Sequence, residues 1–191
     1  MKVSDEKAKE LVDAWRDAHP KIRNYWYSLE EAATQAITHP GNAYKVGKVA
    51  YIKKGSFLCC RLPSGRVMYY PYPKIEMVDT PWGEKKMGIT YMSQDSMTKK
   101  WTRCKTYGGS LFENIVQAAA RDILADAMLR LDDAGFKIVM HVHDEIVAEV
   151  PTKNPKFALE VFEKGMSEVP QWAQGLPIVA KGWTGLRYRK G

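Results

Sequence analysis

Residues 138–148 read IVMHVHDEIVA, two short apolar runs around a polar, ionisable centre. Apolar runs of this kind on either side of a polar centre are typical of two buried strands joined by a turn. Ionised groups are costly in such surroundings unless they bind something or lie at a solvent-facing turn. The sequence therefore predicts a buried β-hairpin whose tip carries His143, Asp144 and Glu145.

Three interpretations of this tip are open. A carboxylate at a tight strand junction suits Mg²⁺, which takes one or two protein carboxylates plus phosphate oxygens, and Asp144 is the best candidate ligand. A zinc site is an alternative, because His141 and His143 alternate onto one face of a strand and a carboxylate follows. The third interpretation is a polar turn that only joins two strands.

The segments around this hairpin predict an α+β protein. Apolar residues at helical spacing predict helices over 5–18, from Pro20 to about His39, from a capping box at Ser110 to a stop at Gly135, and from Pro155 onward behind an Asn154 cap. Short β-prone runs predict strands near 47–54, 56–61, 66–71, 86–92 and 98–105, a hairpin turn at 63–65, and a closing strand over 176–189. We expect an antiparallel sheet that carries the HDE hairpin and is covered by helices, with a helix pair at its N-terminal side.

Basic charge is concentrated in one segment. The whole chain of 191 residues carries 29 Lys+Arg and 22 Asp+Glu, a net charge of +7. Residues 41–106 hold 13 Lys+Arg and 4 Asp+Glu, a net charge of +9. The rest of the chain holds 16 Lys+Arg and 18 Asp+Glu, a net charge of −2. Cations interleaved with Tyr and Trp suit the phosphates and bases of a nucleic acid. A strand region with one wet basic face and one buried aromatic face is the alternative.

Gln117 and Arg121 are four residues apart in the longest predicted helix, so both project from one of its faces. Gln offers a donor and an acceptor, and Arg a planar fork of donors, which suits base edges or phosphates. The alternative is a solvated helix face on which Arg121 pairs with a nearby acid, namely Asp122, Asp126 or Glu145.

Composition excludes several classes of protein. A chain with 45% hydrophobic residues is not a disordered tail. Three cysteines, two of them adjacent, form neither an even disulfide framework nor a CxxC zinc spacing, so we expect a reducing, cytoplasmic compartment. The N-terminus is charged and no apolar run approaches the ~20 residues of a membrane span, so we expect neither a secretion signal nor a membrane partner.

The tract HDEIVAEV at 143–150, followed by Pro151, resembles the third palm motif of family A DNA polymerases, the group of bacterial DNA polymerase I and many phage replicases. Further segments resemble the same family in order along the chain: AWRDAHP at 14–20, the helix pair that joins fingers to palm; LPSGRVMYYP at 62–71, a Gly-Arg…Tyr-x-Pro segment; and QAAARDI at 117–123, a Gln-containing palm helix. The YGG at 107–109 and PIVAKGW at 177–183 are most similar to phage or prophage members.

This resemblance implies roles for single residues. Asp144 would be a catalytic, metal-binding carboxylate flanked by His143 and Glu145 near the primer terminus, and Gln117 would contact duplex DNA in the minor groove. We group Arg121 and Arg66 with Gln117 as DNA-binding residues. The implied reaction is nucleotidyl transfer in DNA replication with two Mg²⁺ ions.

The resemblance also implies a setting for the chain. Residues 1–40 would be the helix pair that joins fingers to palm, and residues 41–191 the C-terminal part of the palm, with a basic β-rich segment at 41–106. The implied partners are primer-template DNA and deoxynucleoside triphosphates, in the cytoplasm of a bacterial or phage-infected cell.

Two motifs of that family have no counterpart in this sequence. They are the fingers helix and the first palm motif, whose Asp is the other metal ligand. The string YMSQD at 91–95 is superficially similar to the first motif, but its Asp falls at the wrong end. Since Asp144 alone cannot clamp two metals, we expect the isolated chain to be inactive until the missing N-terminal polymerase part is supplied. A truncated polymerase, a prophage remnant and half of a split enzyme all agree with this sequence.

Two other classes of function compete with a polymerase. One is a metal-dependent hydrolase built on His141, His143, Asp144 and Glu145. The other is a noncatalytic nucleic-acid-binding module, for which the basic segment would suffice and Asp144 would be dispensable.

Overall fold

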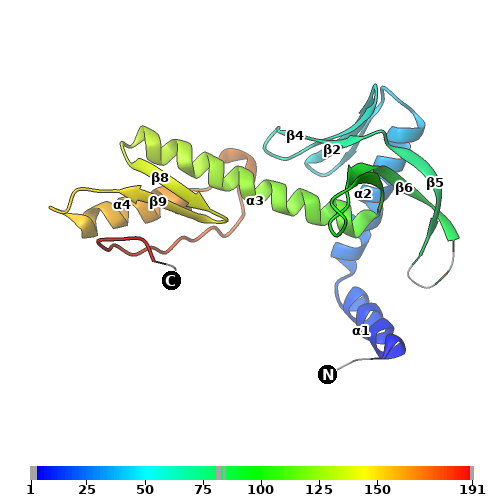
Figure 1. Ribbon diagram of the computed structural model, residues 1–191, viewed down its shortest axis with the longest axis horizontal. Coiled ribbons are helices and arrows are strands. Elements are labelled where there is room, and N and C mark those ends of the chain that lie inside the picture. Colours follow the sequence, from blue (N-terminus) through cyan, green and yellow to red (C-terminus); the bar gives the residue numbers. More distant parts are fainter. Residues whose placement is uncertain (1–3, 81–82, 84, 190–191) are drawn as a thin grey trace. The chain divides into compact units, whose positions relative to one another are not determined.

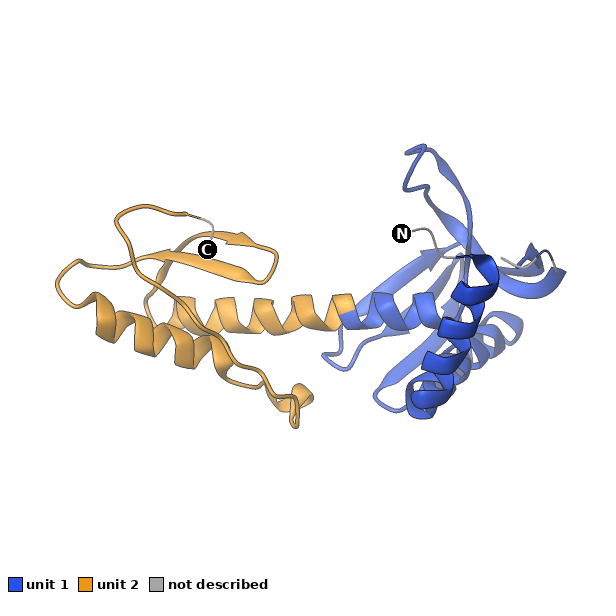
Figure 2. Cartoon of the chain, turned by 90° about the horizontal axis from the view of Figure 1, so that it is seen from below, with its two compact units in different colours: residues 1–116 blue, residues 117–191 orange. Residues whose placement is uncertain are grey.

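The computed structural model describes residues 4–80, 83 and 85–189, and it confirms the α+β class with antiparallel strand pairing (Figure 1). The chain divides into two compact units, Met1–Val116 and Gln117–Gly191 (Figure 2). Helix α3, Gly108–Asp133, supplies residues to both units. Among the described residues, no helix has the length and apolar content needed to cross a membrane.

Two helices open the first unit, as predicted. Helix α1, Asp5–Ala18, begins behind Ser4, whose hydroxyl accepts a hydrogen bond from the amide of Lys7 at 3.3 Å. Helix α2, Pro20–Thr38, begins with a proline, whose fixed φ suits a first helical turn. Its apolar face, with Leu29 fully buried, packs against the strands that follow.

A four-stranded antiparallel sheet follows α2. Its strands β1 to β4 lie side by side in chain order and span Ala43–Val46, Val49–Lys54, Phe57–Arg61 and Val67–Pro71. The predicted turn at 63–65 joins β3 to β4, where the amide of Gly65 donates to the carbonyl of Leu62 at 2.9 Å. Strand β1 was not predicted as a separate strand, because a tight turn at Gly47, with φ of 58°, separates it from β2 by only two residues.

A three-stranded antiparallel sheet completes the strands of the first unit. Strands β5, β6 and β7 lie in chain order and span Lys74–Asp79, Lys85–Gln94 and Trp101–Thr106. The last two correspond to predicted strands. The prediction omitted β5, because a proline precedes it and half of its residues are charged.

The start of α3 differs from the prediction. The helix begins at Gly108, so Ser110 lies within its first turn and the predicted capping box is wrong. Instead, the amide of Gly108 donates to Oε2 of Glu30 on α2 at 2.8 Å. This carboxylate satisfies a free N–H group and complements the positive end of the helix dipole.

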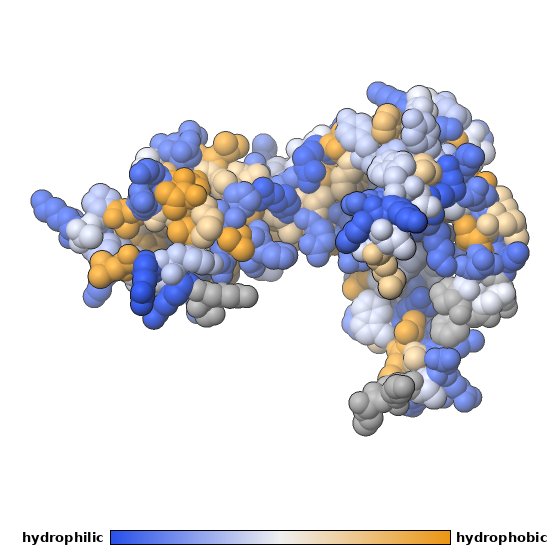
Figure 3. Space-filling view, viewed as in Figure 1, coloured by the Kyte–Doolittle hydropathy of each residue, from blue (hydrophilic) through white to orange (hydrophobic). Residues whose placement is uncertain are grey.

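The second unit contains the predicted hairpin. Strands β8, Lys137–Val142, and β9, Glu145–Glu149, pair with each other and with no other described strand. The prediction that the hairpin is buried is wrong: the side chains of Val139 and Val142 are 51% and 42% exposed. Figure 3 shows apolar side chains at the surface over this hairpin. Apolar side chains of β8 therefore remain in water.

Helices of the second unit pack around an apolar core. Helix α4, Pro155–Ser167, starts at the predicted proline, although the Asn154 side chain makes no capping hydrogen bond. On α3, Leu131 is 1% exposed and contacts the backbone at Gly165 of α4. The guanidinium of Arg130 donates to the carbonyl of Glu168 at 2.8 Å and so fixes the end of α4. A short 3-10 helix, Gln171–Ala173, follows.

The closing strand predicted over 176–189 is wrong, because the structure has no strand there. The amide of Ala180 donates to Oγ of Ser167 at 2.9 Å, and that of Gly182 donates to Oε1 of Glu163 at 2.6 Å. Side chains of α4 therefore take the hydrogen bonds that a neighbouring strand would have taken.

Candidate functional site

His143 and Asp144 form the two-residue turn between β8 and β9, where Val142 pairs with Glu145. His143 has a φ of 55°, in the left-handed region that few residues other than glycine adopt but in which His is enriched. His143, Asp144 and Glu145 are all exposed. The turn therefore presents two neighbouring carboxylates to solvent at a defined position.

Asp144 and Glu145 also line a cavity of about 660 Å³ in the second unit. Its walls come from α3, β9, α4 and the chain end, and they include apolar residues such as Leu124 and Phe162. Arg187 lines the same cavity. The carboxylates of the turn therefore share one space with three cations, Lys181, Arg187 and Arg189, and with apolar side chains.

Tyr188 contacts the turn directly. Its hydroxyl donates to Oε2 of Glu145 at 3.0 Å, and this hydrogen bond raises the pKa of Tyr188. The guanidinium of Arg189 lies 5.1 Å from the ring centre of Trp183, and this cation–π contact joins the two ends of the segment 183–189. The sequence alone gives no sign of this role for Tyr188, because its contact with Glu145 joins residues 43 positions apart.

The zinc interpretation of the turn is not supported. Within the described residues, no three His, Cys, Asp or Glu side chains lie close enough together to hold a metal ion. His141 lies in β8 opposite Ile146, whereas His143 has left the strand for the turn. The strand alternation that was expected to place both imidazoles on one face ends at Val142.

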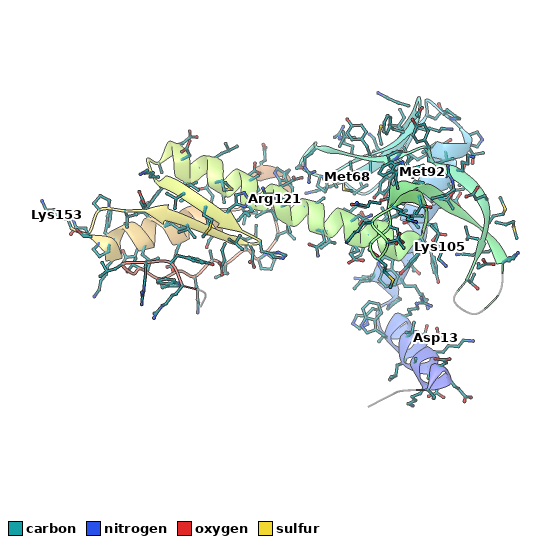
Figure 4. All side chains as sticks on the ribbon, viewed as in Figure 1. Asp13, Met68, Met92, Lys105, Arg121 and Lys153 are labelled. Atoms are coloured by element: carbon teal, nitrogen blue, oxygen red, sulfur yellow. The ribbon has the colours of Figure 1, made fainter. Side chains whose placement is uncertain are left out.

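Gln117 and Arg121 lie one turn apart on α3 and are both exposed, as their spacing predicted (Figure 4 labels Arg121). One acid suggested as an alternative partner of Arg121 is engaged elsewhere: Oδ2 of Asp126 accepts a hydrogen bond from the indole N–H of Trp172 at 2.8 Å. The side chains of Gln117 and Arg121 therefore both lie at the surface of the second unit.

Two further positions singled out in the sequence lie in the first unit. Arg66 is exposed directly after the β3–β4 turn, where its carbonyl accepts from the amide of Leu62 at 2.8 Å. Asp95, at the end of YMSQD, follows β6 and accepts hydrogen bonds from the amide and the hydroxyl of Thr98 at 2.7 and 2.8 Å. Its carboxylate is thus occupied in closing a local turn.

Comparison with known proteins gives one strong similarity. The chain is 42% identical over 190 residues to a protein named DNA polymerase from Bacillus phage SP02. The match covers 100% of this chain and 28% of the phage protein, so the chain spans less than a third of that relative's length. The resemblance to a phage DNA polymerase is thereby confirmed. No protein-family model and no solved structure matches the chain.

Proposed function

We propose that this chain is the C-terminal palm part of a family A DNA polymerase, and that Asp144 is one of the carboxylates that hold its catalytic Mg²⁺ ions. One observation carries the proposal. His143 and Asp144 form an exposed turn with Glu145 directly after it, and this chain matches part of a phage DNA polymerase over the whole of the chain's own length. Carboxylate oxygens are the ligands that Mg²⁺ prefers, so the donor type of Asp144 and Glu145 fits this ion.

In this role, bound Mg²⁺ would activate the primer 3′ hydroxyl and neutralise charge on the transferred phosphate. Asp144 supplies an anionic oxygen at the tip of a short, tightly turned hairpin. Glu145 is oriented by its hydrogen bond from Tyr188. His143, whose backbone makes the turn possible, lies beside both carboxylates and can donate or accept a hydrogen bond at the primer terminus.

The remaining metal ligand is proposed to come from a first palm motif in another part of the polymerase. In support, the described residues contain no group of three or more potential ligands placed for a metal ion. Two metals bound by one Asp would lack the carboxylates that clamp them. The isolated chain is therefore proposed to be inactive in primer extension, and to become active when the missing part is supplied.

DNA contacts are proposed for Gln117 and Arg121 on α3 and for Arg66 after the β3–β4 turn. All three side chains are exposed, and the basic segment at 41–106 carries a charge of +9. Primer-template DNA and deoxynucleoside triphosphates are the proposed partners of the assembled enzyme, in the cytoplasm of a bacterial or phage-infected cell.

Reconstitution tests the proposal. The chain is mixed with a separately produced chain that contains the part of the SP02 polymerase outside the matched region, and extension of a labelled primer is measured with Mg²⁺. Each chain alone should give no product, whereas the mixture should extend the primer. Extension by this chain alone would refute the proposed incompleteness.

Substitutions in the reconstituted mixture test the role of Asp144. Asp144→Ala should abolish extension while DNA binding by this chain is largely retained, whereas Asp133→Ala, at an exposed position on α3, should preserve both. A noncatalytic nucleic-acid-binding module predicts instead that Asp144→Ala has no effect on any activity of the mixture.

A further inference from the structure

The four-stranded sheet β1–β4 has two faces of very different character. Antiparallel partners lie on the same face, and side chains alternate along each strand. One face contains Tyr51, Leu58, Cys60 and Tyr70, which are at most 5% exposed. It packs against the rest of the first unit: Tyr70 meets Tyr91 of β6 edge to face, with ring centres 5.0 Å apart. We call this the inner face.

The outer face is formed by the alternate residues, and apart from Cys59 all are partly or fully exposed: Ala43, Lys45, Ala50, Ile52, Lys54, Phe57, Arg61, Val67, Tyr69 and Pro71. Two aromatic rings stand on it, with Phe57 41% and Tyr69 61% exposed. Their ring centres are 5.9 Å apart in an edge-to-face arrangement. The rings belong to the neighbouring strands β3 and β4 and form one exposed aromatic pair.

The outer face carries cations and no acid. Residues 43–71 contain six Lys and Arg and no Asp or Glu. Three of these cations lie on the outer face, and Lys54 is the direct cross-strand partner of Phe57. The second, Arg61, lies further along the same strand as Phe57, and the third, Lys45, lies on β1. The charged side chains of this face are therefore all cations, and its exposed aromatic rings lie at the start of β3 and on the edge strand β4.

We propose that the outer face of the β1–β4 sheet binds single-stranded DNA, with Phe57 and Tyr69 stacking on unpaired bases and Lys45, Lys54 and Arg61 pairing with phosphates. Bases in a duplex are stacked on each other and hide their faces, so exposed rings on a flat sheet can stack only with unpaired bases. Aromatic side chains on a sheet with basic flanks are a recurring solution for single-stranded nucleic acids. The choice of DNA over RNA rests on the proposed function, because the unpaired template strand of primer-template DNA is a single-stranded DNA.

A docked protein explains the outer face less well. Protein interfaces bury an apolar centre, whereas here the aliphatic residues are small or only partly exposed and three cations lie among them. A polyanion with planar groups complements both the charge and the rings.

Binding of labelled oligonucleotides tests the proposal on the full chain. A fluorescein-labelled thymidine oligonucleotide longer than about 16 nucleotides covers a typical single-strand site, and a duplex of equal length serves as competitor. The double variant Phe57→Ala/Tyr69→Ala removes two stacking rings and should raise the Kd for the single strand by at least about 30-fold. Tyr27→Ala, which removes a 59% exposed ring from α2, is the matched control and should leave the Kd unchanged. Circular dichroism checks that each variant is folded.

Salt dependence tests the cations separately. Each phosphate contact on a single strand adds about −0.7 to the slope of log K against log salt concentration. Lys54→Gln/Arg61→Gln should therefore make this slope shallower by about 1.4. Lys153→Gln/Lys156→Gln removes the same charge from exposed positions in the second unit and should leave the slope unchanged.

Cross-linking locates the contact. Oligonucleotides with 5-iododeoxyuridine should give photo-cross-links at Phe57 or Tyr69. The proposal is overturned if the aromatic double variant binds like the native chain, if the duplex competes as well as the single strand, or if the cross-links lie outside residues 43–71. These readouts do not depend on polymerisation. Failure of the reconstituted extension with intact single-strand binding would refute the proposed function only, and the reverse result would refute this inference only.

Discussion

The hydroxyl of Tyr188 donates a 3.0 Å hydrogen bond to Oε2 of Glu145 and thereby joins the end of the chain to the residue that follows Asp144. The two residues are 43 positions apart in sequence. Arg187, which precedes Tyr188 in sequence, lines the same cavity as Asp144. The segment that contacts Glu145 therefore also places a cation beside the turn. Two sets of contacts therefore hold the residues at the turn: the pairing of β8 with β9, and the hydrogen bond from Tyr188.

The first prediction concerns the titration of Tyr188. Its pKa is raised, first by the hydrogen bond to Glu145 and then by burial and the charge of that carboxylate. The bond is present below this raised pKa and is lost as pH rises through it, because tyrosinate cannot donate. Glu145→Gln should lower the pKa of Tyr188, as measured by NMR of ring-labelled tyrosine. Glu149→Gln, which affects only a carboxylate that pairs with Lys137, should not change it. Equal titration curves in the two variants would contradict the contact.

Local sequence signals predicted the helices well and the environment of the hairpin poorly. Pro20 and Pro155 mark helix starts because their fixed φ suits a first turn, and both starts are observed. The continuously apolar run Ile138-Val139-Met140 predicts burial, yet the side chains of Val139 and Met140 are 51% and 38% exposed. Continuous apolarity shows which side chains a strand could bury, and the layers that pack on the two faces of the sheet decide which ones it does bury.

The candidate site was predictable only in its local part. Asp144 and Glu145 were found because charge between apolar runs is unusual, and they do lie at a turn. Tyr188 was missed because its contact depends on the path of residues 176–189, which follow side chains of α4 instead of forming a strand. Such a path has no periodic signature in the sequence.

The second prediction concerns the buried hydroxyl of Tyr51. The residue is fully buried, and among the described residues its hydroxyl meets no strong hydrogen-bond partner, only the thiol of Cys60, which is a weak donor and acceptor. Burial raises its pKa, and the neighbouring Cys60 thiol adds to that effect. An unsatisfied buried polar group costs about 1–3 kcal/mol, so Tyr51→Phe should leave the free energy of unfolding unchanged or increase it by up to about 2 kcal/mol. Urea denaturation measures the change.

Leu58→Ala provides the opposite control for the same core. Leu58 is also fully buried, and removal of such a side chain leaves a cavity that costs about 2–5 kcal/mol. A destabilisation of Tyr51→Phe that approaches this range would show that the hydroxyl makes a strong hydrogen bond and would contradict the prediction.

The third prediction concerns the turn at Asp95. Hydrogen bonds from the amide and hydroxyl of Thr98, and from the amide of Met97, lower the pKa of this carboxyl group. The turn is therefore stabilised above the unfolded-state pKa of Asp95, and this contribution is lost as pH falls through the lower folded-state value. Thr98→Val removes the hydroxyl donor and should raise the pKa of Asp95 in a carboxyl-detected NMR titration. Ser96→Ala should not raise it, and a rise of equal size there would contradict the assignment of the donors.

The fourth prediction separates two adjacent glycines at the start of α3. A Cβ on Gly108 would collide with the backbone carbonyl of Trp26, which cannot move without shifting α2. This close contact between α2 and α3 also lets the amide of Gly108 donate a hydrogen bond to the carboxylate of Glu30. A Cβ on Gly109 would meet only the ring of Tyr107, at 2.8 Å, and an exposed ring can rotate away. Overpacking against fixed backbone costs about 1–3 kcal/mol, which exceeds the gain of up to about 1 kcal/mol from Ala in a helix. Gly108→Ala should therefore lower the free energy of unfolding in urea, whereas Gly109→Ala should be neutral or stabilising. Equal effects of the two substitutions would mean that α2 and α3 do not approach each other closely at Gly108.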